Sequence, residues 1–255
     1  MKYIVSFLSA LGMFTAIPMP QYEWDMEHGS RMTACFGLVG AVLGTLSLFF
    51  AWIFSLLPIP VPVFSVLTIA AAYFLTGFLH LDGFMDVCDA LLSHRDEEGR
   101  RQILKDSHCG SFSVVCLLFV LAGNFASIYA LRTLPVSAAI WAAVFISIPV
   151  LSRCTAGLLL LGVKTMPGST LGAFFKTGNG PAVKAVLIVT GISALAVVAG
   201  CAGIRYAITL AAGALPGALL GLYAARRLGG VNGDVSGFTV VLCETLMMLA
   251  LTFQF

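Results

Sequence analysis

Three aspartates lie close together in the segment 80–89, where Asp82, Asp86 and Asp89 are spaced as i, i+4 and i+7. On a helix this spacing places the three carboxylates on one face. Two carboxylates about 6 Å apart repel each other by roughly 3 kcal/mol at an effective dielectric constant of 20. A divalent cation removes this repulsion, and carboxylate, water and phosphate oxygens are the ligands that Mg²⁺ prefers. The pattern therefore predicts a magnesium site for a phosphorylated substrate, with a solvated acidic helix end as the alternative.

The residues around these aspartates suit the same chemistry. Gly83 leaves room beside Asp82 for a phosphate group or for close helix packing. Asp106 stands just before an apolar stretch, where we expect it to complete the acidic cluster as a fourth metal ligand. Arg100 and Lys105 are candidates to neutralise substrate phosphates. The alternative for both is that they only mark the cytoplasmic side of a membrane protein.

A second polar segment, Gly229-Gly230-Val231-Asn232-Gly233-Asp234, precedes the last apolar stretch. Its glycines permit a tight loop whose backbone N–H groups can approach a phosphate. Glycine loops are common, so this pattern alone is a weak signal. Asp234 and Glu244 are ten residues apart, nearly three helical turns, and we expect them on the same side of the last helix.

Two charged residues stand alone within apolar stretches. Glu244 lies inside the last of them, and Arg153 lies near the end of another. A charge at membrane depth is costly unless an opposite charge or a polar substrate meets it. We therefore expect Glu244 to be paired or functional, and Arg153 to meet acids or a phosphate group.

The composition defines the environment of these groups. Of the 255 residues, 59% are apolar and only 10% are charged, whereas about a quarter of the residues in soluble domains are charged. A spanning helix needs about 20 apolar residues, and long apolar runs favour helices over barrel strands. We predict an all-α, polytopic membrane helix bundle with a short N-terminal helix that is re-entrant or interfacial. The seven expected spans are 35–57, 61–80, 111–131, 136–157, 183–200, 205–225 and 238–254.

The charges gather on one side of this single membrane domain, which covers residues 1–255. If the loops alternate sides, one side holds ten basic residues and the other holds only Arg132 and Arg205. The positive-inside rule then places the richer side in the cytoplasm, with an acidic loop at 81–110 and a glycine-rich loop at 226–237. We expect a plasma-membrane protein whose active site faces the cytoplasm.

Taken together, these residues resemble the cobalamin synthase family, the adenosylcobinamide-GDP ribazoletransferases. Their order, spacing and position between apolar spans match the family over most of the chain, from Ile17-Pro18-Met19-Pro20 onward. The chain departs from the family pattern at Ala16, at Ala90 and in the run 164–175. The motifs that carry the resemblance are His80-Leu81-Asp82-Gly83 with Asp86 and Asp89, Lys105-Asp106-Ser107 with Gly110, and Gly229-Gly230-x-x-Gly233-Asp234 with Glu244.

The resemblance implies an enzyme that joins adenosylcobinamide-GDP to α-ribazole or α-ribazole 5'-phosphate and releases GMP, with Mg²⁺ as cofactor. The product, adenosylcobalamin or its 5'-phosphate, completes nucleotide-loop assembly in cobalamin biosynthesis. The expected partners are these substrates and the lipid bilayer, with no nucleic acid. The sequence does not decide whether the protein forms a homo-oligomer. The expected catalytic residues are Asp82, Asp106 and Asp234, and the expected metal ligands are Asp82, Asp86, Asp89 and Asp106. The expected substrate-binding residues are His80, Gly83, Arg100, Lys105, Arg153, Gly230, Asn232, Gly233 and Glu244.

Two other functions use similar residues. A lipid head-group phosphotransferase of the CDP-alcohol type also combines an Asp-Gly motif with aspartates and a divalent metal, but Ser93-His94-Arg95 fits the Ala-Arg part of its pattern poorly. A cation or proton-coupled transporter would place ionisable groups near mid-membrane and often has inverted repeats. Only Glu244 suits that description.

Overall fold

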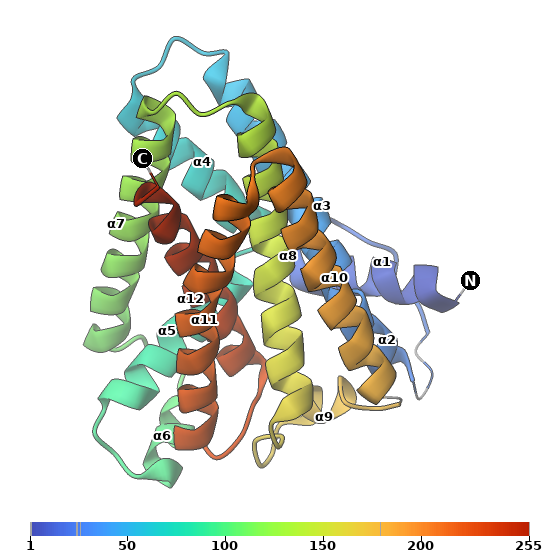
Figure 1. The fold of residues 1–255 in the computed structure, drawn as a ribbon. Helices are drawn as coiled ribbons and strands as arrows, with labels where there is room; N and C mark the ends of the chain where they lie inside the picture. The colour runs from blue at the N-terminus through green and yellow to red at the C-terminus, as the bar shows by residue number, and fades with distance from the viewer. Residues whose placement is uncertain (1, 24, 26, 179, 255) are drawn as a thin grey trace.

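The computed structural model describes residues 2–23, 25, 27–178 and 180–254. These residues form twelve helices and no strand, which confirms the predicted all-α fold (Figure 1). One isolated parallel β-bridge, between Thr165 and Val231, joins two loops. The helices are α1 (Lys2–Phe14), α2 (His28–Ala34), α3 (Phe36–Ser55), α4 (Val61–Leu75), α5 (Leu79–Leu92), α6 (Glu97–Ile103), α7 (Ser111–Thr133), α8 (Ala138–Gly162), α9 (Thr170–Phe174), α10 (Gly180–Cys201), α11 (Ile204–Arg227) and α12 (Gly233–Thr252).

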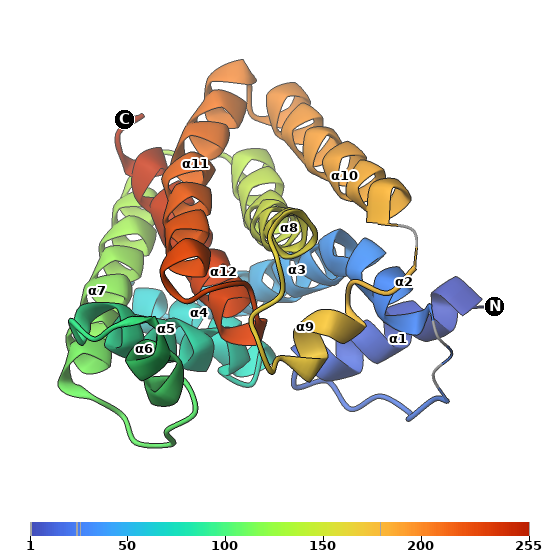
Figure 2. The same cartoon turned by 90° about the horizontal axis from the view of Figure 1, so that it is seen from below.

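Six helices, α3, α7, α8, α10, α11 and α12, are long and apolar enough to cross a membrane. They confirm six of the seven predicted spans and make the chain a polytopic helical membrane protein. In α8 and α12, 67% and 61% of the most apolar stretch is buried, against 17% in α10. Helices α8 and α12 therefore form the centre of the bundle, and Figure 2 shows α8 with α3, α10, α11 and α12 around it.

The remaining predicted span, 61–80, corresponds to a bent pair of helices, α4 and α5, which together are long and apolar enough to cross a membrane as one broken span. Helix α4 ends at Leu75, and α5 leaves it at an angle of 92°. Gly77 has a φ of 56°, and the Phe78 N–H donates to the Tyr73 carbonyl at 3.1 Å. This is the Schellman arrangement that ends helices, and glycine adopts its left-handed backbone without strain. Because of the bend, α5 does not continue α4 but packs against α12 and α7.

Glycines allow the central helices to approach each other closely. A Cβ added at Gly44 of α3 would lie 2.5 Å from the Phe145 carbonyl oxygen of α8, and one added at Gly213 of α11 would lie 2.7 Å from the Met247 Cα of α12. Any larger residue at either position would force the backbones apart. Small residues at helix crossings are typical of membrane bundles, where close packing holds the helices together.

The N-terminal helix α1 lies across the bundle rather than along it (Figures 1 and 2). Its 13 residues are too few to cross a membrane, and it packs on α2 and α3. Tyr3 and Ile4 on its outer side are exposed. This geometry fits an interfacial helix. The loop that joins α1 to α2 is held by Arg31. The hydrogen bond from Arg31 to Asp25 keeps the pKa of the Asp25 carboxyl below its ordinary value.

Candidate active site

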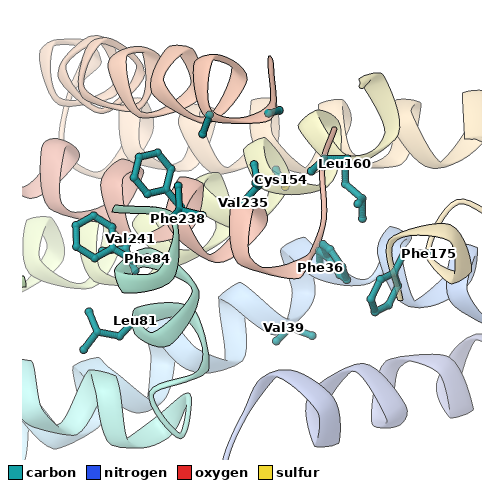
Figure 3. Packing of buried hydrophobic residues seen from close by; sticks show 14 of the residues in the cluster. Phe36, Val39, Leu81, Phe84, Cys154, Leu160, Phe175, Val235, Phe238 and Val241 are labelled. Carbon is teal, nitrogen blue, oxygen red and sulfur yellow. The ribbon is translucent and has the colours of Figure 1, made fainter. Parts of the chain in front are cut away.

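The first turns of α5 and α12 cross each other closely. A Cβ added at Gly83 would lie 2.8 Å from the Asp234 Cα, and one added at Gly237 would lie 3.0 Å from a backbone oxygen of α5. Beside this crossing, the rings of Phe84 and Phe238 stack with centroids 5.6 Å apart (Figure 3). Of the two predicted roles of Gly83, close helix packing is therefore the one that the structure shows.

This crossing adds a fourth carboxylate to the acidic face of α5. The Asp86 carboxylate is repelled by those of Asp82, Asp234 and Asp89, and Asp234 is in turn repelled by Asp82. Among the residues that the structure describes, no ion pair involves Asp82, Asp86 or Asp234. Nor do any three described His, Cys, Asp or Glu side chains lie close enough together to hold a metal ion. A bound ion would need further oxygens from water or substrate.

Asp89 has a structural task that its spacing did not reveal. Its Oδ2 accepts a hydrogen bond from the Gly110 N–H at 2.7 Å, and its Oδ1 accepts one from the Ser113 N–H at 2.9 Å. Both N–H groups belong to the start of α7, where helix N–H groups lack backbone partners. Asp89 therefore ties α5 to the N-terminus of α7. Its predicted role as a metal ligand stays a prediction.

Asp106 lies in a different place from Asp82 and Asp234. It is exposed, and its Oδ1 accepts hydrogen bonds from the His108 backbone N–H at 3.0 Å and meets the His108 ring Nδ1 at 2.6 Å. This contact lowers the pKa of Asp106 and raises that of His108. Asp106 and Asp89 line an open hollow of about 600 Å³ between α5, α6 and the start of α7, to which no described residue of α12 contributes.

The glycine loop is held by the segment that follows α8. The Val231 N–H donates to the Lys164 carbonyl, and the Met166 N–H donates to the Val231 carbonyl, both at 2.9 Å. A Cβ added at Gly230 would lie 2.5 Å from the Met166 nitrogen, so only glycine fits there. The predicted tight loop is confirmed, and its partner, the segment after α8, was not foreseen.

Asn232 begins α12 and orients its first acid. Its Oδ1 accepts a hydrogen bond from the Val235 N–H at 3.0 Å, which is the normal bond of a helix N-cap. Its Nδ2 donates to Asp234 Oδ2 at 2.7 Å. One amide side chain thus caps the helix and sets the direction of the Asp234 carboxylate.

Arg153 and Glu244, predicted separately, form an ion pair between α8 and α12. Ser152 Oγ also donates to Glu244 Oε1, at 2.9 Å. The Arg153 side chain is only 6% exposed, so its charge needs this partner. The sequence contained a signal for the pair, because both were lone charges of opposite sign in apolar spans.

Two neighbouring cavities collect half of the predicted site residues. The larger, of about 250 Å³, is lined by six of the predicted residues, and the smaller, of about 110 Å³, lies between α3, α4, α7, α8 and α12. His80 and Arg153 line both cavities, and Glu244 lines the smaller. The six predicted residues of the larger cavity are His80, Asp82, Arg153, Asn232, Gly233 and Asp234.

The remaining predicted residues do not line the larger cavity. Lys105 is exposed, whereas Arg100 is buried with its Nε unpaired among the described residues. The smaller cavity also holds a polar pair that was not predicted, in which Asn124 Nδ2 donates to Tyr73 Oη at 2.9 Å. An amide within the apolar run 111–131 was the signal that pointed to it.

The chain is similar to known proteins over most of its length. A family model described as cobalamin-5-phosphate synthase matches residues 6–252. The chain belongs to the cobalamin-5-phosphate synthase family. It is 37% identical over 241 residues to an adenosylcobinamide-GDP ribazoletransferase of Clostridium perfringens strain SM101, covering 94% of each chain. Relatives of the same name occur in Clostridium botulinum strain Alaska E43, 32% identical over 93% of this chain and 92% of the relative, and in Geobacillus kaustophilus strain HTA426, 31% identical over 94% and 92%. No solved structure matches the chain.

Membership of the cobalamin-5-phosphate synthase family confirms the resemblance and makes the chain a transferase of cobalamin synthesis, acting in nucleotide-loop assembly. Two of the three motifs that carried the resemblance meet at the larger cavity, through Asp82 and Asp234. The third, around Asp106, lies at the separate hollow beside Asp89.

Proposed function

We propose that this chain joins adenosylcobinamide-GDP to α-ribazole or α-ribazole 5'-phosphate in the larger cavity. A ribose hydroxyl oxygen attacks the phosphorus attached to cobinamide. The bond from that phosphorus to the bridging oxygen of the diphosphate breaks, and GMP leaves with the bridging oxygen. The observation that supports this most is that Asp82 and Asp234, from opposite halves of the chain, line one cavity together with Arg153 and Asn232.

The polar end of this cavity suits a diphosphate. Gly233 and Asp234 belong to the first turn of α12, where backbone N–H groups and the helix dipole favour negative charge. Arg153 supplies a guanidinium that lies in both cavities. A guanidinium can bind phosphate oxygens in pairs and stabilise the charge that develops on the departing GMP.

The carboxylates suit Mg²⁺, which we propose as the cofactor. Asp82 and Asp86 repel each other and have no basic partner among the described residues. Mg²⁺ usually binds through one or two carboxylates and completes its shell with water and substrate phosphates, which agrees with the lack of a preformed three-residue site among those residues. Asp82, which lines the cavity, and Asp86, one turn further along α5, would hold the ion at the edge of the cavity. When bound, it would neutralise charge on the diphosphate.

Asp234 is the group that we propose as the acceptor of the ribose hydroxyl proton. The hydrogen bond from Asn232 fixes the direction of its carboxylate, and it lines the cavity on the α12 side, opposite Asp82. The other candidate, Asp106, lines a different hollow and has its carboxylate engaged by His108. A well-placed general base contributes about 10²–10⁴-fold to rate.

The test is GMP release from adenosylcobinamide-GDP by membranes that contain the protein, with and without α-ribazole and Mg²⁺. We expect release to require both, and Asp82→Asn to lower it at least about hundredfold, as does loss of other strong electrostatic groups. Glu23→Gln, at an exposed carboxylate, is the matched control. Release by Asp82→Asn at the control rate would refute the proposed site. Release that needs no α-ribazole would refute the reaction.

We also propose that the protein lies in the plasma membrane with its active site on the cytoplasmic side. Helices α6 and α9 and the basic end of α11 lie at one end of the bundle, as the positive-inside rule requires for a cytoplasmic face (Figure 1). Two exposed cysteines provide the test: Cys109 precedes α7 at this end, and Cys201 ends α10 at the other. In inside-out vesicles a membrane-impermeant thiol reagent should label a variant that retains only Cys109, and not one that retains only Cys201. The reverse result would invert the orientation.

A further inference from the structure

Three aromatic rings from distant parts of the chain form the apolar wall of the larger cavity. Phe14 ends α1, Phe36 begins α3, and Phe175 follows α9. The ring centroids of Phe14 and Phe36 are 4.9 Å apart, those of Phe14 and Phe175 are 5.6 Å apart, and those of Phe36 and Phe175 are 5.7 Å apart. Figure 3 shows Phe36 and Phe175 side by side. We call these three residues the aromatic wall.

The aromatic wall lies in the same cavity as the acids. Asp82, Asn232 and Asp234 line the cavity together with all three rings, so a ligand within it meets an aromatic surface and a polar surface at once. Phe36 and Phe175 are 8% and 4% exposed, and burial of this kind leaves their rings in fixed positions. A cavity with an aromatic wall and a few polar groups at one end favours a ligand with an aromatic apolar part and a polar part, because aromatic rings pack edge-to-face as well as stacked.

We infer that the aromatic wall binds the heteroaromatic base of the ribose-bearing substrate, and so orients its ribose hydroxyl toward Asp234. This inference rests on the proposed function. A volume of about 250 Å³ suits a bicyclic base and its ribose, and it is too small for a substituted corrin ring. The corrin of the second substrate therefore stays outside this cavity, and only its diphosphate reaches the polar end.

The chemistry of the wall separates this base from guanine, the other base in the reaction. Guanine carries several hydrogen-bond donors and acceptors around its ring edges, and each one buried without a partner costs about 1–3 kcal/mol. The lining beside the rings is apolar, with Met13, Leu160 and Leu171 as neighbours. A benzimidazole joined to ribose has only one ring nitrogen left as an acceptor, so it loses little on entering such a site.

One polar side chain, that of His80, lies beside the wall. His80 lines the cavity with its ring centroid 6.3 Å from that of Phe14, and its Nδ1 is buried without a hydrogen-bond partner among the described residues. His80 therefore brings one polar side chain to the otherwise apolar surroundings of the aromatic wall.

The test measures the two substrates separately. In purified protein in detergent, we expect Phe175→Leu to raise the Kd of α-ribazole, measured by equilibrium dialysis, by about five- to tenfold, the effect of one lost aromatic pair. The KM of adenosylcobinamide-GDP should change less than twofold. Phe14→Leu, at a half-buried position, should have the same effect with little risk to folding. Phe119→Leu, at a 75% exposed ring on α7, is the matched control and should change neither value.

Other results would overturn the inference. An unchanged Kd for α-ribazole in both variants would show that the rings do not touch it. A rise confined to the KM of adenosylcobinamide-GDP would place guanine or the corrin against the wall. If wild-type protein bound α-ribazole but released no GMP, the proposed reaction would fail while the base site remained, so the two failures are distinct.

Discussion

Breaking the ion pair between Arg153 and Glu244 should destabilise the bundle by several kcal/mol. Opposite charges about 4 Å apart attract by about 4 kcal/mol at an effective dielectric constant of 20, and removing one partner of a buried pair typically costs about 3–5 kcal/mol. The side chain of Arg153 is 6% exposed and that of Glu244 is 29% exposed. Glu244→Met leaves the more buried charge, that of Arg153, without a partner, so it should lower the free energy of unfolding by about 5 kcal/mol. Arg153→Met leaves the less buried Glu244 without a partner and should lower it by about 3 kcal/mol.

A double-mutant cycle measures this directly. The free energy of unfolding is obtained by titrating the protein in mixed micelles with a denaturing detergent, for both single variants and for the double variant. Replacing a buried pair by apolar residues of similar volume is often nearly neutral, so the double variant should lie within about 2 kcal/mol of wild type. The surface pair Arg101–Glu98, with an N–O distance of 2.7 Å and side chains 19% and 63% exposed, is the matched control. Its coupling energy should stay below about 1 kcal/mol.

Two results would refute this reasoning. If the single losses at Arg153 and Glu244 simply add in the double variant, the two side chains do not interact. If Arg153→Met costs more than Glu244→Met, then the difference in burial does not decide which unpaired charge is worse.

Two further predictions concern a glycine and a surface pair. Gly83→Ala should lower the free energy of unfolding by about 1–3 kcal/mol and lower GMP release, because the new Cβ would lie 2.8 Å from the Asp234 Cα. Gly162→Ala is the control and should change neither quantity, because nothing lies within 4 Å of its new Cβ. Equal shifts of the melting temperature in the two variants would contradict this prediction. The pKa of His108 is raised and that of Asp106 is lowered, so both groups are charged and attract each other fully between pH 3.8 and pH 6.5, their ordinary pKa values. The attraction is lost as the pH falls through the lowered pKa of Asp106, and also as the pH rises through the raised pKa of His108. In an NMR titration the His108 midpoint should lie above 6.5 and fall in Asp106→Asn; a midpoint unaffected by that substitution would show that the pair does not form.

The spans were predictable because a single local property determines them. An apolar run of about 20 residues satisfies both the lipid and its own backbone hydrogen bonds as a helix, wherever its neighbours lie. The exception is the break after α4, where Gly77 interrupts an apolar run. The run itself carried no charge, so composition predicted one span over 61–80 and said nothing of the bend, although a glycine followed by a bulky residue was a visible helix-ending signal.

The acidic face of α5 was predictable for a related reason. The positions i, i+4 and i+7 share one side of any helix, so Asp82, Asp86 and Asp89 had to lie together once the segment was helical. What each of them contacts was not contained in the spacing. Asp89 bonds the first N–H groups of α7, because the loop through Gly110 returns to it.

Residue types and periodicity thus determined that the chain is a helical membrane protein, which side of α5 is acidic, and which polar residues had to be explained. The tertiary structure alone decided that Asp234 joins Asp82 at one cavity, that Arg153 meets Glu244, and that Asp106 lies elsewhere. The physical reason is range. Helix formation and lipid solubility depend on neighbours within a few residues, whereas these contacts depend on how α5, α8 and α12 cross, and the crossings depend on glycines whose partners lie far away in the chain.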